Sequence, residues 1–212
     1  MQDDTSANVA EFLLQVKAIK LQPDNPFTWA SGWKSPIYCD NRIALSHPRI
    51  RTYIRQEFVK AIEKYYGRPD MIAAVATRAI AQGALVAEAM GLPLVYVRPT
   101  PKEHGTKNQI EGEAKPNHSC VVIEDLVSTG KSSLSAVDAL RKHNVVVKGM
   151  VCAFNYGFDI AAENFKKAGV PLYSLSNYES LLKKAVASKY ITENQVETLQ
   201  QWRENPAEWK KK

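Results

Sequence analysis

The stretch VVIEDLVSTGKSS, from Val121 to Ser133, decides what kind of fold this 212-residue chain adopts. Four apolar residues ending at Ile123 predict a buried strand, and Glu124 and Asp125 follow at its carboxyl end. A turn of small and hydroxyl residues then leads into a helix. In such a turn the backbone N–H groups converge, hydroxyls add donors, and the helix N-terminus adds partial positive charge. We therefore predict a monophosphate site beside two carboxylates, which suit the vicinal hydroxyls of a ribose or a hydrated Mg²⁺.

Two other interpretations compete with a monophosphate site. Gly130-Lys131-Ser132 is typical of the end of a Walker A loop, but that motif needs a glycine five residues before Gly130. The chain has Asp125 there, and its carboxylate would repel a triphosphate. The other alternative is an ordinary strand–turn–helix with incidental acids. Two adjacent carboxylates at the end of a buried strand are costly without a partner, which argues against it.

Apolar runs and amphipathic helices alternate on both sides of this stretch. The expected strands are 71–77, 94–98, 120–125, 145–154 and 172–177. The expected helices are 6–20, 48–66, 79–90, 132–143, 160–169 and 178–189. This order predicts one α/β domain over residues 1–212, in which helices flank a parallel sheet on both faces. Ligands bind beyond the carboxyl ends of such strands, where we expect the loops 77–80, 98–119 and 126–132.

The composition indicates an ordinary globular chain, 45% hydrophobic and 24% charged, with a formal net charge of +6. That charge suits a nucleic acid or a small polyanion, but no helix-turn-helix module is recognisable, so we expect no nucleic-acid partner. Cys39, Cys120 and Cys152 lack the spacing of a zinc site or a disulfide framework, which indicates a reducing compartment. The first residues are unlike a signal peptide, and no apolar run reaches the ~20 residues that span a bilayer. We therefore expect a cytoplasmic protein with no membrane partner.

The stretch around Glu124 and Asp125 resembles the signature of type I phosphoribosyltransferases, which has four apolar residues, two acids and a small-residue loop with Thr-Gly. The resemblance implies a type I phosphoribosyltransferase-like fold that binds phosphoribosyl pyrophosphate (PRPP). It assigns the acidic pair to the ribose, with Asp125 among the catalytic residues. It also implies that Mg²⁺ is bound mainly through PRPP, not by a metal site of the protein. The 5′-phosphate is assigned to Leu126, Val127, Ser128, Thr129, Gly130, Lys131 and Ser132.

The polar segment after residue 97 is too long for an ordinary connection, and its glycines suit hinges. Its Arg98…Lys102-Glu-His104-Gly order resembles the catalytic loop of orotate phosphoribosyltransferases. That resemblance implies that Arg98, Lys102 and His104 contact pyrophosphate, that Lys102 and His104 are catalytic, and that the loop reaches into the neighbouring subunit of a homodimer. Members of the family often have a lysine where this chain has Pro99; either Lys107 compensates or fewer contacts suffice.

An N-terminal segment strengthens the resemblance. Residues 27–38, FTWASGWKSPIY, look like the Phe-Thr-x-x-Ser-Gly-x-Lys-Ser-Pro stretch that forms a hood over the pyrimidine in that family. The resemblance places the hood mainly in about residues 1–45. It assigns Ser31, Gly32, Lys34 and Tyr38 to the binding of orotate. A Pro-rich turn with core aromatics is the simpler alternative.

Two further positions bear on the substrate. Arg78 follows the strand from Met71, where the family has a pyrophosphate loop, although an exposed ion pair would explain it equally well. Many members carry an arginine that pairs with the orotate carboxylate where this chain has Tyr156. A tyrosine supplies no charge, so the carboxylate must be bound by Ser128, backbone N–H groups or another cation.

The resemblance therefore implies transfer of the phosphoribosyl group of PRPP to N1 of orotate, in pyrimidine biosynthesis. The products are orotidine 5′-monophosphate (OMP) and pyrophosphate. Two alternatives stay open: a phosphoribosyltransferase for a purine or another base, and a regulator that senses PRPP with the same fold.

Overall fold

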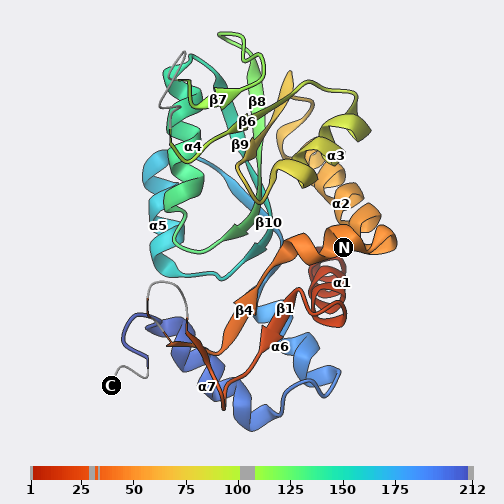
Figure 1. Cartoon of the computed structure of the whole chain (residues 1–212), viewed down its shortest axis with the longest axis vertical. Helices are drawn as coiled ribbons and strands as arrows, with labels where there is room; N and C mark the ends of the chain where they lie inside the picture. Colours follow the sequence, from red (N-terminus) through yellow and green to blue (C-terminus); the bar gives the residue numbers. More distant parts are fainter. Residues whose placement is uncertain (1, 29–31, 33, 101–107, 210–212) are drawn as a thin grey trace.

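A six-stranded sheet forms the centre of the molecule (Figure 1). The computed structural model describes the backbone of residues 2–28, 32, 34–100 and 108–209. The strands lie in the order β10-β9-β8-β5-β6-β7 and are parallel, except that β7 is antiparallel to β6. The strands are β5 (Met71–Val75), β6 (Leu94–Val97), β7 (Ile110–Glu111), β8 (Ser119–Val127), β9 (Val146–Asn155) and β10 (Leu172–Asn177).

Helices cover both faces of this sheet, as the alternating pattern predicts (Figure 1). On one side α2 (Pro48–Tyr66) packs against α3 (Ile80–Met90), and on the other α4 (Lys131–Lys142) packs against α5 (Asp159–Ala168). Every residue of β5 is buried, which explains its continuous apolar run. The expected α/β fold with a parallel sheet is confirmed.

The N-terminal and C-terminal segments lie together beyond one end of the sheet (Figure 1). Here β1 (Ile19–Leu21) pairs antiparallel with β4 (Ile37–Cys39), and β2 (Phe27–Thr28) pairs with β3 (Lys34–Ser35). The short helix η1 (Asn41–Ser46) then leads into α2. The other elements of this region are α1 (Gln2–Gln15), α6 (Tyr178–Ala187) and α7 (Glu193–Glu204).

Hydrogen bonds join the two ends of the chain. The hydroxyl of Ser6 on α1 donates to the hydroxyl of Ser180 on α6 at 2.8 Å, and Ser176 on β10 donates to the backbone carbonyl of Ser6 at 2.8 Å. One buried apolar cluster runs from Val9 to Trp202, so both ends of the chain belong to the same core. No helix in the described part of the chain is long and apolar enough to cross a membrane.

The prediction of a first helix over residues 6–20 was wrong at its end. α1 ends at Gln15, and Lys17 takes a left-handed φ of 57°. Ile19 then begins a strand in which buried and half-buried residues alternate. Its apolar residues fit a helical stripe as well as a strand, and only the pairing of Ile19 with Cys39 decides between them.

The strand that carries the acidic pair is also longer than expected. β8 does not end at Asp125 but continues to Val127, which pairs with Asn155 of β9. Because β9 runs equally far, the partner strand keeps β8 extended after the apolar run has ended. The loop that is predicted to bind phosphate therefore begins two residues later than the sequence pattern indicates.

Candidate active site

A cleft of about 760 Å³ opens where the expected loops leave the sheet. In parallel sheets this carboxyl edge is the usual place for a ligand. Segments that follow β5, β6 and β8 all border it, together with one side chain from the N-terminal region. Its lining among the described residues includes Arg42, Thr77, Arg78, Arg98, Pro99, Glu124, Asp125, Leu126, Ser128, Thr129, Gly130, Lys131, Ser132 and Ser133.

Glu124 and Asp125 form a buried acidic pair in this cleft, 4% and 6% exposed. One carboxylate oxygen of Glu124 accepts from the backbone N–H of Asp125 at 2.9 Å, and the other accepts from the hydroxyl of Ser133 at 2.8 Å. Burial, and then the charge of Asp125, raises the pKa of Glu124 to about 8. Burial also raises the pKa of Asp125. Oδ2 of Asp125 is buried without a donor among the described residues, so the pair stands to gain from a ligand hydroxyl or from a cation.

The loop after the acidic pair lines the cleft and leads directly into the start of a helix, as expected for a phosphate site. Ser128, Thr129, Lys131 and Ser132 line the cleft, and α4 starts at Lys131. Leu126 lines it as well. The amide of Asn164 on α5 donates to the backbone carbonyl of Thr129 at 3.0 Å and holds the loop. Backbone N–H groups at the start of a helix beside small hydroxyl residues bind anions.

Gly130 is required in this loop for two reasons. Its φ is +78°, where residues with a side chain are strained, and a Cβ would lie 2.7 Å from Cε2 of Phe165. Val127 differs from the other predicted loop residues, because its side chain is fully buried and its carbonyl accepts from the backbone N–H of Tyr156 at 3.1 Å. The structure therefore does not bring the side chain of Val127 into the cleft.

Two of the predicted pyrophosphate contacts reach the same cleft. Arg78 follows β5, is exposed, and exerts an opposing, lowering effect on the pKa of Asp125. The backbone N–H of Arg98 donates to the carbonyl of Gln109 at 2.9 Å, and its guanidinium lies 3.5 Å from the carboxylate of Glu111. Lys102 and His104 lie outside the described residues.

The structure does not bring the predicted orotate contacts of the hood into the described lining of the cleft. Ser31 lies outside the described residues, and Gly32 is exposed with a φ of +83°. Lys34 donates to the hydroxyl of Thr28 at 2.8 Å across the β2–β3 hairpin. Tyr38 is 42% exposed and packs against Phe27. Neither Lys34 nor Tyr38 lines the cleft as its described residues define it.

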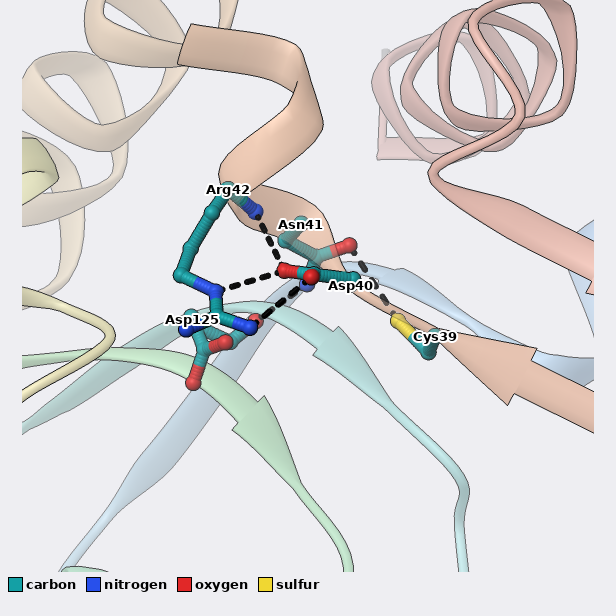
Figure 2. Close-up of polar contacts among 5 residues, drawn as sticks. All are labelled: Cys39, Asp40, Asn41, Arg42 and Asp125. Carbon is teal, nitrogen blue, oxygen red and sulfur yellow. Dashed lines mark hydrogen bonds and ion pairs between the residues drawn. The ribbon is translucent and has the colours of Figure 1, made fainter.

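The sequence prediction missed three polar residues that connect the hood to the acidic pair (Figure 2). The amide of Asn41 donates to the backbone carbonyl of Asp125 at 2.7 Å. Arg42 makes a bidentate ion pair with Asp40, in which Nε donates at 2.7 Å and Nη2 at 2.8 Å. Arg42 also lines the cleft. The signal was available, because Asp40-Asn41-Arg42 is a polar run directly after an apolar strand, where the Asx residues can turn the chain.

Tyr156 does not present an exposed ring to a ligand. It is 2% exposed, and its ring lies within 6 Å of those of Phe154, Phe158 and Trp202. Burial raises its pKa well above the ordinary value. The position where the resemblance expects an arginine is therefore occupied by a core aromatic residue.

Comparison with known proteins places this chain in a family. Residues 44–168, more than half of the chain, match the family described as the phosphoribosyl transferase domain. The chain is 57% identical over 200 residues to the orotate phosphoribosyltransferase of Bacteroides thetaiotaomicron, and the match covers 94% of each. The chain belongs to the orotate phosphoribosyltransferase family.

Solved structures agree with membership of the orotate phosphoribosyltransferase family. The orotate phosphoribosyltransferase of Aeropyrum pernix matches with a TM-score of 0.74 and 27% identity, over 83% of this chain and 97% of that one. The UMP synthase of Leishmania donovani matches with a TM-score of 0.78 and 28% identity over 93% of this chain. This chain spans 42% of that protein.

Proposed function

We propose that this orotate phosphoribosyltransferase family member transfers the phosphoribosyl group of PRPP to N1 of orotate, which gives OMP and pyrophosphate. The observation that carries the proposal is the meeting of a buried acidic pair and a Gly130-centred phosphate loop in one cleft. A ribose 5-phosphate needs both, because its phosphate requires converging donors and its hydroxyls require acceptors. The named relative and the hood segment supply the choice of orotate as the base.

The reaction breaks one bond to C1′ and forms another. Pyrophosphate leaves with the electrons of the C1′–O bond, while N1 of orotate loses its proton and forms the N1–C1′ bond. The phosphate loop fixes one end of the sugar and the acidic pair holds its hydroxyls, so C1′ is positioned between base and leaving group. Arg78 and Arg98 border the cleft where they can stabilise the pyrophosphate charge.

The predicted loop completes this arrangement. Lys102 and His104 are expected to contact the pyrophosphate when the loop closes, and closure excludes water from the electron-poor C1′. We further propose that the enzyme is a homodimer in which each loop serves the neighbouring subunit, and that it acts in the cytoplasm. All three cysteines are free and buried, which fits a reducing compartment.

The residues present also fit a magnesium ion carried in by PRPP. In the described part of the chain, Oδ2 of Asp125 is buried without a hydrogen-bond donor. Mg²⁺ prefers such carboxylate oxygens and keeps several of its waters, so one or two protein ligands suffice. Asp125, with Glu124 beside it, would hold the hydrated ion, which supplies positive charge to the pyrophosphate.

A panel of bases tests the function directly. The enzyme is mixed with PRPP, Mg²⁺ and one base at a time, and loss of orotate absorbance or formation of a nucleotide is followed. We expect turnover with orotate and none with adenine, guanine or hypoxanthine. Turnover with a purine but not with orotate would contradict the proposed substrate, and PRPP binding without any turnover would indicate a regulator.

Replacing Lys102 by Ala tests the role of the loop. We expect turnover to fall by at least tenfold while PRPP affinity changes much less, since the contact strengthens as the leaving group gains charge. Steady-state kinetics and PRPP titration measure the two effects. Mixing inactive Lys102→Ala and Asp125→Asn chains should restore part of the activity, because one hybrid site then has both intact residues. No restored activity after subunit exchange would contradict a shared loop.

A further inference from the structure

The ion pair between Asp40 and Arg42 lies close to Asp125 (Figure 2), and Arg42 and Asp125 both line the cleft. Its geometry is fixed, because Nε and Nη2 of Arg42 donate to the two carboxylate oxygens of Asp40 at 2.7 and 2.8 Å. The neighbouring Asn41 is anchored to the backbone carbonyl of Asp125. The turn that carries the guanidinium is therefore tied directly to the acidic pair.

Arg42 keeps donors for a second partner. A guanidinium has five N–H groups, and the contacts with Asp40 use one on Nε and one on Nη2. The remaining N–H of Nη2 and the two of Nη1 include a parallel pair at the end of the side chain. Such a pair fits the two oxygens of a carboxylate.

Local structure alone does not explain this guanidinium. Asp40 already caps η1, because its carboxylate accepts from the backbone N–H of Arg42 at 3.2 Å. That bond needs no arginine side chain. The side chain of Arg42 is half exposed, at 51%, and its pair with Asp40 is therefore weakly stabilising. The carboxylate of Asp40 therefore holds the guanidinium of this half-exposed side chain at the edge of the cleft, in an orientation that suits an incoming anion.

The chemistry of orotate places an anion at this point. Its carboxylate is on C6, the atom next to N1, so during bond formation it lies beside C1′ and the ribose. The charged carboxylate of Asp125, assigned to the ribose, repels it there, and a cation close to Asp125 offsets that repulsion. Arg42 lines the cleft together with Asp125, and its neighbour Asn41 is bonded to the backbone carbonyl of Asp125 at 2.7 Å.

The other described cations of the cleft face different groups. Lys131 begins α4 within the phosphate loop, and Arg98 pairs with Glu111 beside β6. Arg78 follows β5, in the segment assigned to pyrophosphate. Arg42 is the cation that reaches the cleft from the hood side, where the base is expected to bind.

We propose that Arg42, oriented by Asp40, binds the C6 carboxylate of orotate and so distinguishes orotate from pyrimidines that lack it. This inference rests on the proposed function and assigns the charge that Tyr156 does not provide. It differs from the predicted role of Ser128, which offers one neutral donor.

The test compares two nucleotides that differ only in this carboxylate, OMP and UMP. Binding of each is measured by calorimetry for the wild type, Arg42→Gln, Arg42→Lys and Arg78→Gln. Arg141→Gln is the matched control, because Arg141 hydrogen bonds to the backbone carbonyl of Ala168, at the C-terminal ends of α4 and α5 and outside the described lining of the cleft. The kinetic constants KM for orotate and KM for PRPP are measured for the same proteins.

We expect Arg42→Gln to weaken OMP binding and raise KM for orotate by about tenfold or more, the loss of a charged hydrogen-bonded contact. UMP binding and KM for PRPP should stay within about twofold of the control. Arg42→Lys should fall in between, because it keeps the charge and loses the fork. An unchanged preference for OMP in Arg42→Gln, or its loss in Arg78→Gln instead, would overturn the proposal.

The wild type separates failure of this inference from failure of the proposed function. If the wild type neither turns over orotate nor prefers OMP to UMP, the proposed function fails. If the wild type does both and Arg42→Gln behaves like Arg141→Gln, only the role of Arg42 fails. Equal weakening of OMP, UMP and PRPP would show that Arg42 supports the fold of the cleft and would also overturn the proposal.

Discussion

Replacing Glu124 by Gln removes one buried acid from the cleft and keeps the size of the side chain. The amide oxygen can still accept from the backbone N–H of Asp125, as Glu124 does at 2.9 Å. The amide NH₂ can donate to the hydroxyl of Ser133, which rotates to accept it. The variant should therefore fold, and its main difference is that position 124 no longer ionises.

The size of the effect follows from the raised pKa of Glu124. At pH values below its ordinary pKa of 4.5, the folded and unfolded chains both hold the proton. Between 4.5 and about 8 the unfolded chain releases the proton and the folded chain keeps it, so the stability from this group falls as pH rises. At about 1.4 kcal/mol per pH unit, the total loss above pH 8 is on the order of 5 kcal/mol as an upper limit.

Urea unfolding of the ligand-free protein at pH 5, 6, 7, 8 and 9 measures this effect. We expect Glu124→Gln to match the wild type or fall slightly below it at pH 5, and to become the more stable protein by several kcal/mol at pH 9. Glu63→Gln is the control, because Glu63 is exposed on α2. A stability difference that varies by less than about 0.5 kcal/mol across this range would refute the reasoning.

Two further substitutions test the loop and the hood, each by urea unfolding. Gly130→Ala should lower the free energy of unfolding by about 2 kcal/mol or more and weaken PRPP binding, because the new Cβ meets both a left-handed φ and the ring of Phe165. Gly91→Ala, with a φ of +60° and open space, should cost about 1 kcal/mol and leave PRPP binding unchanged; equal losses would contradict the role of the loop. Asn41→Ala should lower the free energy of unfolding by about 1–3 kcal/mol, because it leaves the buried carbonyl of Asp125 without this donor. Asn164→Ala should lower it by less, because the bond from Asn164 to the carbonyl of Thr129 is exposed to water. Equal costs would contradict a buried link.

The sequence predicted those parts of the fold that depend on neighbouring residues along the chain. Pro48 and Gly67 bound α2 as predicted, because a proline suits the first turn and a glycine ends the helix with a φ of +65°. The run from Met71 forms a strand with no exposed residue, which matches its lack of polar positions. The loop residues after Asp125 reach the cleft because strand, turn and helix follow one another directly.

Long-range pairing accounts for what the sequence did not predict. Ile19 belongs to a strand because Cys39 lies opposite it, and nothing near Ile19 announces that partner. Tyr156 is a core residue because helices from the end of the chain bring Trp202 against it. Arg42 reaches the cleft because η1 packs beside β8, which a one-dimensional pattern cannot show.

The link between Asn41 and Asp125 joins the turn proposed to bind the base to the strand expected to bind the ribose. The paired register of β5 and β8 ends at Ala74 and Ile123, so β8 continues beyond its neighbour. The amide of Asn41 then supplies a donor to the carbonyl of Asp125, at 2.7 Å and within the protein interior. A shift of η1 would therefore strain the backbone at Asp125, whose carboxylate is expected to hold the ribose. If Arg42 binds the base as proposed, this polar turn sets the position of the base relative to the sugar.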